Sequence, residues 1–431
     1  MRRKITDDLI SWKNKKNRKP LILNGARQVG KTWILKEFGR NHFKKIAYIN
    51  FESNALLKDL FILDFDIKRI ISVLEIQIGA KINAGDTLII FDEIQEAESG
   101  LTSLKYFYEN APQYFIIAAG SLLGLSIQKS NSYPIGKVDF MKLYPMSFTE
   151  FIDNCGEEIL LEQLQNFNWP VIETYHEKLI DYLRTYYFVG GMPEVVASYL
   201  QEKDMSLVRN IQKGIINGYE NDFAKYATID IVPRIKMVWQ SIISQLSKEN
   251  RKFTYSLVQK GARAKDFELA IQWLQDAGLI LKINRVTKPS IPLNAYTDFD
   301  AFKIFLLDIG LINAMANVDV KILLEKNTIL SEFKGALTEQ YVCQQLFSKT
   351  DIFYWTAANA TAELDFLIQV GQDIFPIEVK AEENLKSKSL RVFIEKHENL
   401  RGIRLSMSKF RNQEWMVNYP LYACDALFEI K

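Results

Sequence analysis

The sequence PLILNGARQVGKTWILKEF (Pro20–Phe38) places a glycine-rich turn between a short apolar run and an amphipathic run. Leu21–Asn24 predicts a β-strand, and Thr32–Phe38 predicts the start of a helix. Between them, Gly25–Thr32 has the spacing GxxxxGK[ST]. Such a turn lets backbone N–H groups and a helix N-terminus surround a phosphate group. The sequence therefore predicts a nucleotide-binding loop, with an ordinary glycine-rich turn as the alternative.

The residue types in this loop suit ATP with Mg²⁺. Lys31 would neutralise phosphate charge and take part in catalysis, and the Thr32 hydroxyl would ligate the metal. The residues expected to hold the nucleotide are Gly25, Ala26, Arg27, Gln28, Val29, Gly30, Lys31, Thr32 and Trp33.

Two further strands are expected to end in polar residues. In TLIIFDE, Leu88–Phe91 is continuously apolar, as in a parallel strand that is buried on both faces. Asp92 would complete the Mg²⁺ site, and Glu93 would orient or deprotonate the attacking water. In YFIIAAGS, the final residue, Ser121, is a catalytic candidate because its side chain could sense the terminal phosphate. The alternative for this Gly-Ser pair is a plain turn.

The composition is that of a globular chain with several domains. With 431 residues, 48% hydrophobic and 25% charged, each domain can build an ordinary core. The formal net charge of +2 gives no overall field toward nucleic acid, so any basic surface must be local. Cys155, Cys343 and Cys424 are scattered without metal-site spacing, which favours a reduced, cytoplasmic setting. No apolar run reaches the length of a membrane span, so we expect no membrane partner.

Strand and helix patterns alternate in the N-terminal part of the chain, which predicts an α/β fold with a parallel sheet covered by helices on both faces. The expected strands are Leu21–Asn24, Ile46–Phe51, Leu88–Phe91, Tyr114–Ala119 and Val138–Leu143. Helical patterns follow, interrupted at FVGGMPEVV. We expect a P-loop ATPase domain at 1–147, a helical lid or connector at 148–226, a winged-helix domain at 227–328 and a small α/β domain at 329–431.

The winged-helix prediction rests on Thr254–Leu293, which has the pattern of two helices followed by a strand pair with a basic loop. Arg263 and Lys265 would begin the second helix, where a DNA reader contacts the major groove. Asp266 and Glu268 follow at once, so packing against neighbouring parts of the protein is the alternative.

A second chemical pattern lies in TAELDFLIQVGQDIFPIEVKAEEN. Alternation along its two predicted strands places Asp365, Glu378 and Lys380 on a common side. Glu339 lies on a largely apolar face of the preceding helix, where a carboxylate needs a partner or a cation. These carboxylates could hold Mg²⁺, and Lys380 could polarise an attacking water, as in a D…ExK nuclease. The alternative is an exposed strand without catalytic function, and Pro376 favours an edge or a bulge.

Taken in order, GARQVGKT, INFE, IIFDEIQ, GSLL, LYPMSFTEF, GGMPEVV and AELDFLIQ…IEVK resemble a family over essentially the whole chain. This is the family of bacterial and archaeal AAA-type P-loop ATPases with a GxRQxGKT loop, a GGMP connector and a C-terminal domain of uncharacterised function. The resemblance implies a RecA-like ATPase core and an end like a PD-(D/E)xK restriction endonuclease. It carries the nucleotide roles over to Gly25–Thr32, Asp92, Glu93 and Ser121. Many relatives have arginine where this chain has Lys137, which cannot match the planar fork of an arginine finger.

Two functions from different classes are compatible with these motifs. The first is an ATP-hydrolysing molecular switch whose winged-helix and nuclease-like parts act on DNA or RNA. The second is an ATP-regulated module that binds a protein partner and uses an inactive nuclease-like part as a scaffold. Degradation of DNA with Mg²⁺ by the native chain, but not by Lys380→Ala, would favour the first.

Overall fold

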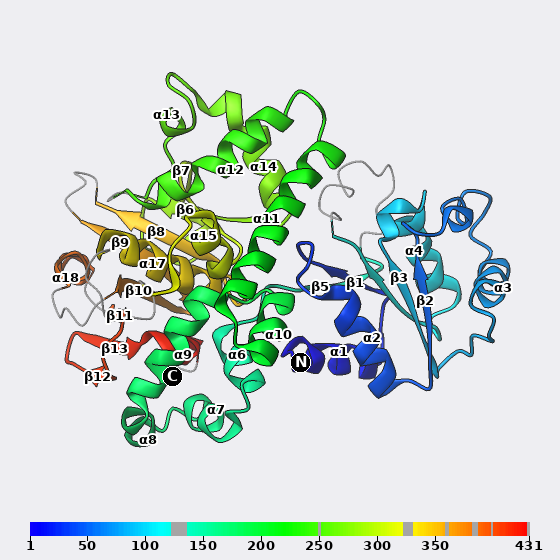
Figure 1. Ribbon diagram of the computed structural model, residues 1–431, viewed down its shortest axis with the longest axis horizontal. Helices are drawn as coiled ribbons and strands as arrows, with labels where there is room; N and C mark the ends of the chain where they lie inside the picture. The colour runs from blue at the N-terminus through cyan, green and yellow to red at the C-terminus, as the bar shows by residue number, and fades with distance from the viewer. Residues whose placement is uncertain are drawn as a thin grey trace. The chain divides into compact units, whose positions relative to one another are not determined.

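The computed structural model describes residues 1–121, 136–248, 251–321, 331–357, 362–381, 387–397 and 400–428. The chain divides into an N-terminal unit, Arg2–Tyr144 with Asp276–Gly278, and a C-terminal unit that holds the remainder (Figure 1). The N-terminal unit ends close to residue 147, the predicted end of the P-loop domain. None of the helices in the described ranges is both long and apolar enough to cross a membrane.

The N-terminal unit is built on a five-stranded sheet with the order β2-β3-β4-β1-β5, and its neighbouring strands are parallel. The strands are β1 (Leu21–Asn24), β2 (Lys45–Asn50), β3 (Thr87–Asp92), β4 (Phe115–Ala119) and β5 (Asp139–Lys142). The helices are α1 (Ile5–Asn14), α2 (Lys31–His42), α3 (Ile67–Ile78) and α4 (Gly100–Asn110). The predicted α/β fold class with a parallel sheet is confirmed.

Side chains alternate between the two faces of this sheet. Ile49 and Phe91 pack in one apolar cluster with residues of α3 and α4. Tyr48, the neighbour of Ile49, faces the other way and meets Lys36 of α2. Helices therefore cover both faces.

The strand register brings three loops to one edge of the sheet. Ala119 of β4 lies opposite both Leu23 of β1 and Asp92 of β3. The carboxyl ends of β1, β3 and β4 are thus level with one another. Ligands of open α/β sheets bind at such an edge.

The C-terminal unit begins with a run of helices. They are α6 (Phe148–Asn154), α7 (Glu158–Gln165), α8 (Trp169–Thr174), α9 (His176–Val189), α10 (Pro193–Glu202), α11 (Met205–Tyr226) and α12 (Val232–Leu246). The break between α9 and α10 is held by close backbone contacts. Met146 N donates to Gly191 O at 2.7 Å, and a Cβ on Gly191 would lie 2.2 Å from Met146 O. Asp308 Oδ2 accepts from Gly191 N at 2.6 Å. Only glycine fits this approach.

The order expected for Thr254–Leu293 is met only in part: two helices and one strand lie within this range, and the second strand begins beyond it, at Thr297. The observed segment is longer. It comprises α13 (Tyr255–Val258), α14 (Ala264–Asp276), β6 (Ile280–Val286) and β7 (Thr297–Leu306). The antiparallel β6–β7 pair continues into the C-terminal strands, because β6 pairs with β8 in parallel. The parts that the sequence separated near residue 328 therefore share one sheet and one unit.

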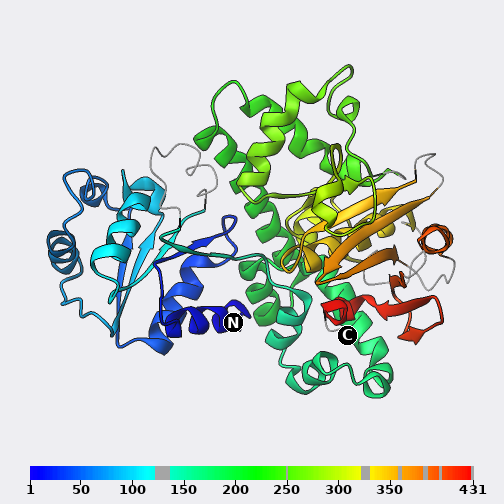
Figure 2. The same ribbon diagram turned by 180° about the vertical axis from the view of Figure 1, so that it is seen from behind.

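This sheet has eight strands in the order β12-β13-β11-β10-β9-β8-β6-β7. Its other strands are β8 (Ile352–Thr356), β9 (Glu363–Val370), β10 (Asp373–Lys380), β11 (Gly402–Ser406), β12 (Arg411–Asn412) and β13 (Met416–Pro420). The remaining helices are α15 (Ile309–Met315), α17 (Ser331–Phe347) and α18 (Lys388–Lys396). The helices α18 and α17 cover opposite faces of this sheet (Figure 1, Figure 2). Leu390 and Phe393 of α18 pack with Leu364 of β9. The side chain of Glu363, the neighbour of Leu364, points to the other face, where α17 lies.

The position of Pro376 corrects an expectation. The sequence favours an edge strand or a bulge at this residue, but β10 lies between β9 and β11. Pro376 is opposite Leu367 of β9, and the parallel pairing with β11 begins only at Ile377. A proline is tolerated inside the sheet because its missing N–H falls before that ladder starts.

Candidate functional site

The loop between β1 and α2 is sharply curved. A Cβ on Gly25 would lie 2.4 Å from Leu143 O, so this position must be glycine. Gln28 and Gly30 have φ angles of 65° and 91°, in the left-handed region. Left-handed residues in a short loop create the backbone concavity that binds anions. The helix α2 starts at the next residue, so its N-terminus joins the same concavity.

Lys31 is folded back onto this loop. Its Nζ donates to Gly25 O at 2.8 Å and to Ala26 O at 2.7 Å, and only 6% of the residue is exposed. Burial lowers the pKa of Lys31 to about 8, although the charges of Glu93 and Asp92 oppose this shift. A buried ammonium group bonded to neutral carbonyls is well placed to accept an anion. The loop therefore offers a site for phosphate.

Asp92 connects three elements at the end of β3. Its Oδ2 accepts from the Thr32 hydroxyl at 2.7 Å and from the Tyr48 hydroxyl at 2.8 Å. Its Oδ1 accepts from Glu93 N at 3.1 Å. A hydroxyl and a buried carboxylate are hard oxygen donors, so the pair Thr32 and Asp92 fits Mg²⁺. Sequence reasoning missed Tyr48.

Glu93 and Ser121 lie side by side. The Ser121 hydroxyl donates to the Glu93 carboxylate at 3.2 to 3.3 Å, and Ser121 N lies 3.3 Å from Oε2. Gln95 Nε2 also donates to Oε2, at 2.5 Å. Glu93 itself has a φ of 50°, a strained value for a non-glycine residue. The backbone of Glu93 is therefore strained at the point where its side chain bonds to Ser121 and Gln95.

Arg3 also contacts the loop between β1 and α2, which the sequence did not indicate. Its Nη1 donates to Val29 O at 3.1 Å and its Nη2 to Tyr144 O at 2.7 Å. Trp33, the residue after Thr32, has an exposed fraction of 38%. Lys137, which replaces the arginine of many relatives, pairs with Glu109 at 2.9 Å.

The predicted nuclease-like residues come together in the C-terminal unit. Lys380 Nζ lies 2.7 Å from Glu378 Oε1, and Asp365 Oδ2 accepts from Val379 N at 2.7 Å. Glu339 is buried, and burial, followed by the charge of Asp365, raises its pKa to about 8. Burial also raises the pKa of Glu378, with a further contribution from Asp365. The three carboxyl groups therefore share one locality.

Two basic residues from earlier in the chain enter this cluster. Arg251 forms an ion pair with Glu339. Lys303 is fully buried, with its Nζ 2.5 Å from Glu363 Oε1 and 3.9 Å from Glu339 Oε2. Among the residues that the structure describes, no three His, Cys, Asp or Glu side chains are grouped as a metal site requires. The cationic side chains of Arg251, Lys303 and Lys380 therefore offset the repulsion between these carboxylates.

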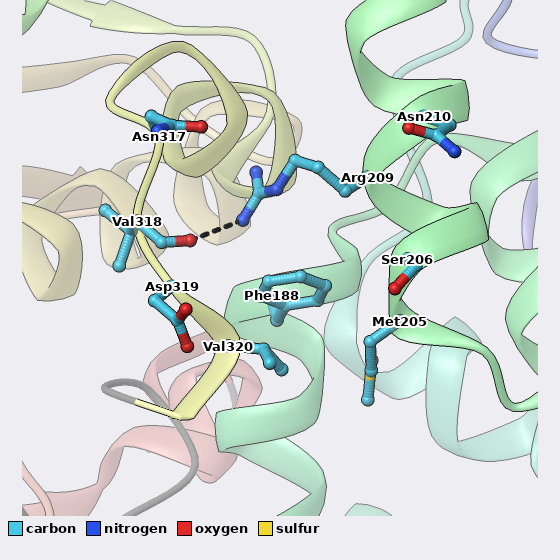
Figure 3. Close-up of a pocket in the computed structure, with 9 residues that line it drawn as sticks. All are labelled: Phe188, Met205, Ser206, Arg209, Asn210, Asn317, Val318, Asp319 and Val320. Carbon is cyan, nitrogen blue, oxygen red and sulfur yellow. Dashed lines mark hydrogen bonds between the residues drawn. The ribbon is translucent and has the colours of Figure 1, made fainter.

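A further cavity, of about 360 Å³, lies apart from every predicted site residue (Figure 3). Its lining comprises Phe188, Met205, Ser206, Arg209, Asn210, Asn317, Val318, Asp319 and Val320. The Arg209 guanidinium lies 4.4 Å from the centre of the Phe188 ring and donates to Val318 O at 2.8 Å. The guanidinium of Arg209 therefore already has partners within the protein.

Comparisons with known proteins divide the chain into three segments. Residues 17–152 match the AAA domain family. Residues 180–321 and 334–422 match two domains of unknown function, DUF8612 and DUF4143. No curated protein matches the chain.

The solved structures that are similar to it at low identity include the following three. A Walker-type ATPase of Pyrococcus abyssi is 16% identical over 73% of this chain and 95% of its own, with a TM-score of 0.46. The Aeropyrum pernix ORC1 protein in complex with DNA is 11% identical, covering 73% and 90%, with a TM-score of 0.30. Drosophila ORC bound to DNA is 11% identical, covering 72% and 93%, with a TM-score of 0.27.

Proposed function

We propose that this chain binds ATP with Mg²⁺ at Gly25–Thr32 and hydrolyses it. It would act as an AAA-type P-loop ATPase in which a DUF4143 segment follows the ATPase domain. The observation that carries the proposal is the register of β1, β4 and β3, which sets the loop, Asp92 and Ser121 level at one edge of the sheet. The hydroxyl of Thr32 already reaches Asp92 at 2.7 Å. This arrangement supports the proposal because it brings the candidate residues to one edge of the sheet.

Each side chain has a defined role in this proposal. Lys31 exchanges the carbonyls of Gly25 and Ala26 for phosphate oxygens and neutralises their charge. Thr32 and Asp92 hold Mg²⁺, which supplies charge neutralisation at the phosphates. Trp33 is an exposed side chain in the first turn of α2 and would be available to the rest of the nucleotide.

Hydrolysis also needs a base for the attacking water. Glu93 is the candidate base. It would take the proton of the water once its carboxylate no longer accepts hydrogen bonds from Ser121 and Gln95. The Ser121 hydroxyl, released in the same movement, would then donate to the terminal phosphate. The nucleotide thereby controls whether Glu93 is held or free.

We further propose that this change acts as a switch on the C-terminal unit, whose winged-helix and nuclease-like parts engage nucleic acid. A second candidate activity, metal-dependent cleavage of a phosphodiester, is favoured by one observation. The charge of Asp365 acts on both Glu339 and Glu378, next to Lys380. The alternative is a scaffold that binds a protein partner, in which Arg251 and Lys303 permanently neutralise the carboxylates.

Nucleotide binding can be tested by thermal unfolding with and without Mg²⁺–ATP. A ligand at about 100 times its Kd stabilises a folded protein by about 2.7 kcal/mol. We expect this gain in the native chain and in Lys44→Ala, an exposed control lysine. Lys31→Ala should lose it because the phosphates lack their counter-charge. Equal gains in Lys31→Ala and the native chain would refute the assignment of the loop.

A further inference from the structure

Tyr48 occupies a junction between three elements of the ATPase domain. It extends from β2, its ring centre lies 3.6 Å from Lys36 Nζ of α2, and its hydroxyl donates to Asp92 Oδ2 of β3 at 2.8 Å. Lys36 is four residues after Thr32, so both side chains share one face of α2. Tyr48 thus lies against the helix turn that carries the expected metal ligand.

Polar contacts, more than packing, orient this tyrosine. A cavity of about 400 Å³ lies beside it and is lined by Ile46, Tyr48, Ile49, Asn50, Ser53, Asn54, Leu57, Gln77 and Ile78. The ring is only half-buried. Asn50 Nδ2 donates to the hydroxyl at 3.4 Å, and Lys36 lies against the ring. A phenylalanine here would keep the shape of the side chain and lose the contact with Asp92.

The hydrogen bonds that Asp92 accepts indicate what the contact with Tyr48 does. Two hydroxyls, those of Thr32 and Tyr48, donate to the same oxygen, Oδ2. In the proposed ATPase the Thr32 oxygen would ligate Mg²⁺, and the Tyr48 hydroxyl would remain a donor to Oδ2 that does not itself bind the metal. Asp92 is 2% exposed, so bulk water has little access to replace the bond. A partner of this kind orients a metal-binding carboxylate.

We propose that Tyr48 is a positioning residue that holds Asp92 in the orientation required for Mg²⁺–ATP. The inference rests on the proposed ATPase function and adds a residue that none of the motifs contains. It makes a specific claim: Tyr48 contributes to the Mg²⁺-dependent part of nucleotide binding and not to the part supplied by the loop and Lys31.

The test compares ATP binding in EDTA with ATP binding at saturating Mg²⁺, by calorimetry. Tyr48→Phe should bind ATP in EDTA as the native chain does. Its gain in affinity on adding Mg²⁺ should be about tenfold smaller, the usual effect of removing an outer-shell partner. Tyr106→Phe is the matched control, because this tyrosine stacks on Phe65 in the same unit at 4.2 Å, away from the site.

Two results would overturn the proposal. One is an unchanged Mg²⁺-dependent gain in Tyr48→Phe; the other is an equal loss with and without Mg²⁺, which would indicate a purely structural role. If Tyr48→Phe unfolds, Lys36→Met provides the same test, since it removes the contact that orients the ring; a gain equal to that of the native chain would again refute the role. Absence of any Mg²⁺-dependent gain in the native chain would instead refute the proposed ATPase function.

Discussion

The Thr32 hydroxyl donates to Asp92 Oδ2 across 2.7 Å and so joins the first turn of α2 to the end of β3. The sequence separates the two residues widely, and the parallel pairing of β1 with β4 and of β4 with β3 brings them together. This bond shows that the loop and the acidic strand are pre-arranged. In the proposed ATPase, binding of Mg²⁺–ATP would then require side-chain changes at the site and no new strand pairing.

The break between α9 and α10 gives a prediction about folding stability. In Gly191→Ala the new Cβ would lie 2.2 Å from a backbone oxygen, Met146 O, which cannot move independently. We expect a loss of about 3 kcal/mol in the free energy of unfolding. Gly214→Ala is the control, because nothing lies within 4 Å of its Cβ. In the helix interior it should stabilise by up to about 1 kcal/mol. Similar effects of the two changes in urea unfolding would contradict this account.

Asp308 gives a prediction about pH. Burial raises its pKa to about 6, although hydrogen bonds from Gly191 N, Leu311 N and Gln344 oppose the shift. Because this exceeds the ordinary value of about 3.9, the folded state binds the proton more tightly than the unfolded state. The stability that protonated Asp308 contributes is present at low pH and is lost as pH rises through about 6.

The variant Asp308→Asn isolates this contribution, since asparagine does not titrate. Relative to the variant, the native chain should lose about 1 kcal/mol of stability between about pH 5 and about pH 7. The measurement is chemical unfolding of both proteins across that range. The prediction is contradicted if the difference in the free energy of unfolding between the two proteins stays constant over this pH range, or if it grows in favour of the native chain as pH rises.

The carboxylate cluster of the C-terminal unit gives a prediction that separates its two candidate roles. If the cluster is a latent metal site, Arg251→Ala should free Glu339, and Mn²⁺ should raise the melting temperature of this variant more than that of the native chain. The additional change Asp365→Ala should cancel the effect. Arg391→Ala is the control, because it removes an arginine from an exposed pair with Glu395.

The nuclease assay completes this comparison. A metal-dependent nuclease should degrade DNA with Mg²⁺, more strongly in Arg251→Ala, and Lys380→Ala should abolish the activity. If Mn²⁺ stabilises none of the variants and none degrades DNA, the scaffold alternative replaces the nuclease hypothesis.

The fold of the N-terminal unit was predictable because its central strands β3, β4 and β1 are largely apolar and its turns are rich in glycine. The predicted strand Leu21–Asn24 is β1 as observed, and Leu88–Phe91 lies within β3. In contrast, the β6–β7 hairpin joins the C-terminal strands through its pairing with β8. Hydrophobic alternation indicates which residues form a strand, but not which distant strand completes the sheet.

The site was predictable where one local motif carries the chemistry, as at Lys31 and Thr32. The residues that sequence reasoning missed act from other elements. Tyr48 reaches Asp92 from β2, and Lys303 reaches Glu363 from β7. Their positions in the sequence give no sign of these contacts, because they depend on strand order and on burial of the charge.

The most direct test of the central claim, ATP hydrolysis with Glu93 as the base, is to measure phosphate release and ATP-dependent thermal stabilisation together in Glu93→Gln. Glutamine keeps the size of the side chain and one acceptor oxygen but cannot take a proton. General-base catalysis contributes about 10²- to 10⁴-fold to a rate, so phosphate release should fall by at least about 100-fold. Stabilisation by Mg²⁺–ATP should remain, because Lys31, Thr32 and Asp92 are intact. Phosphate release equal to that of the native chain would contradict the account.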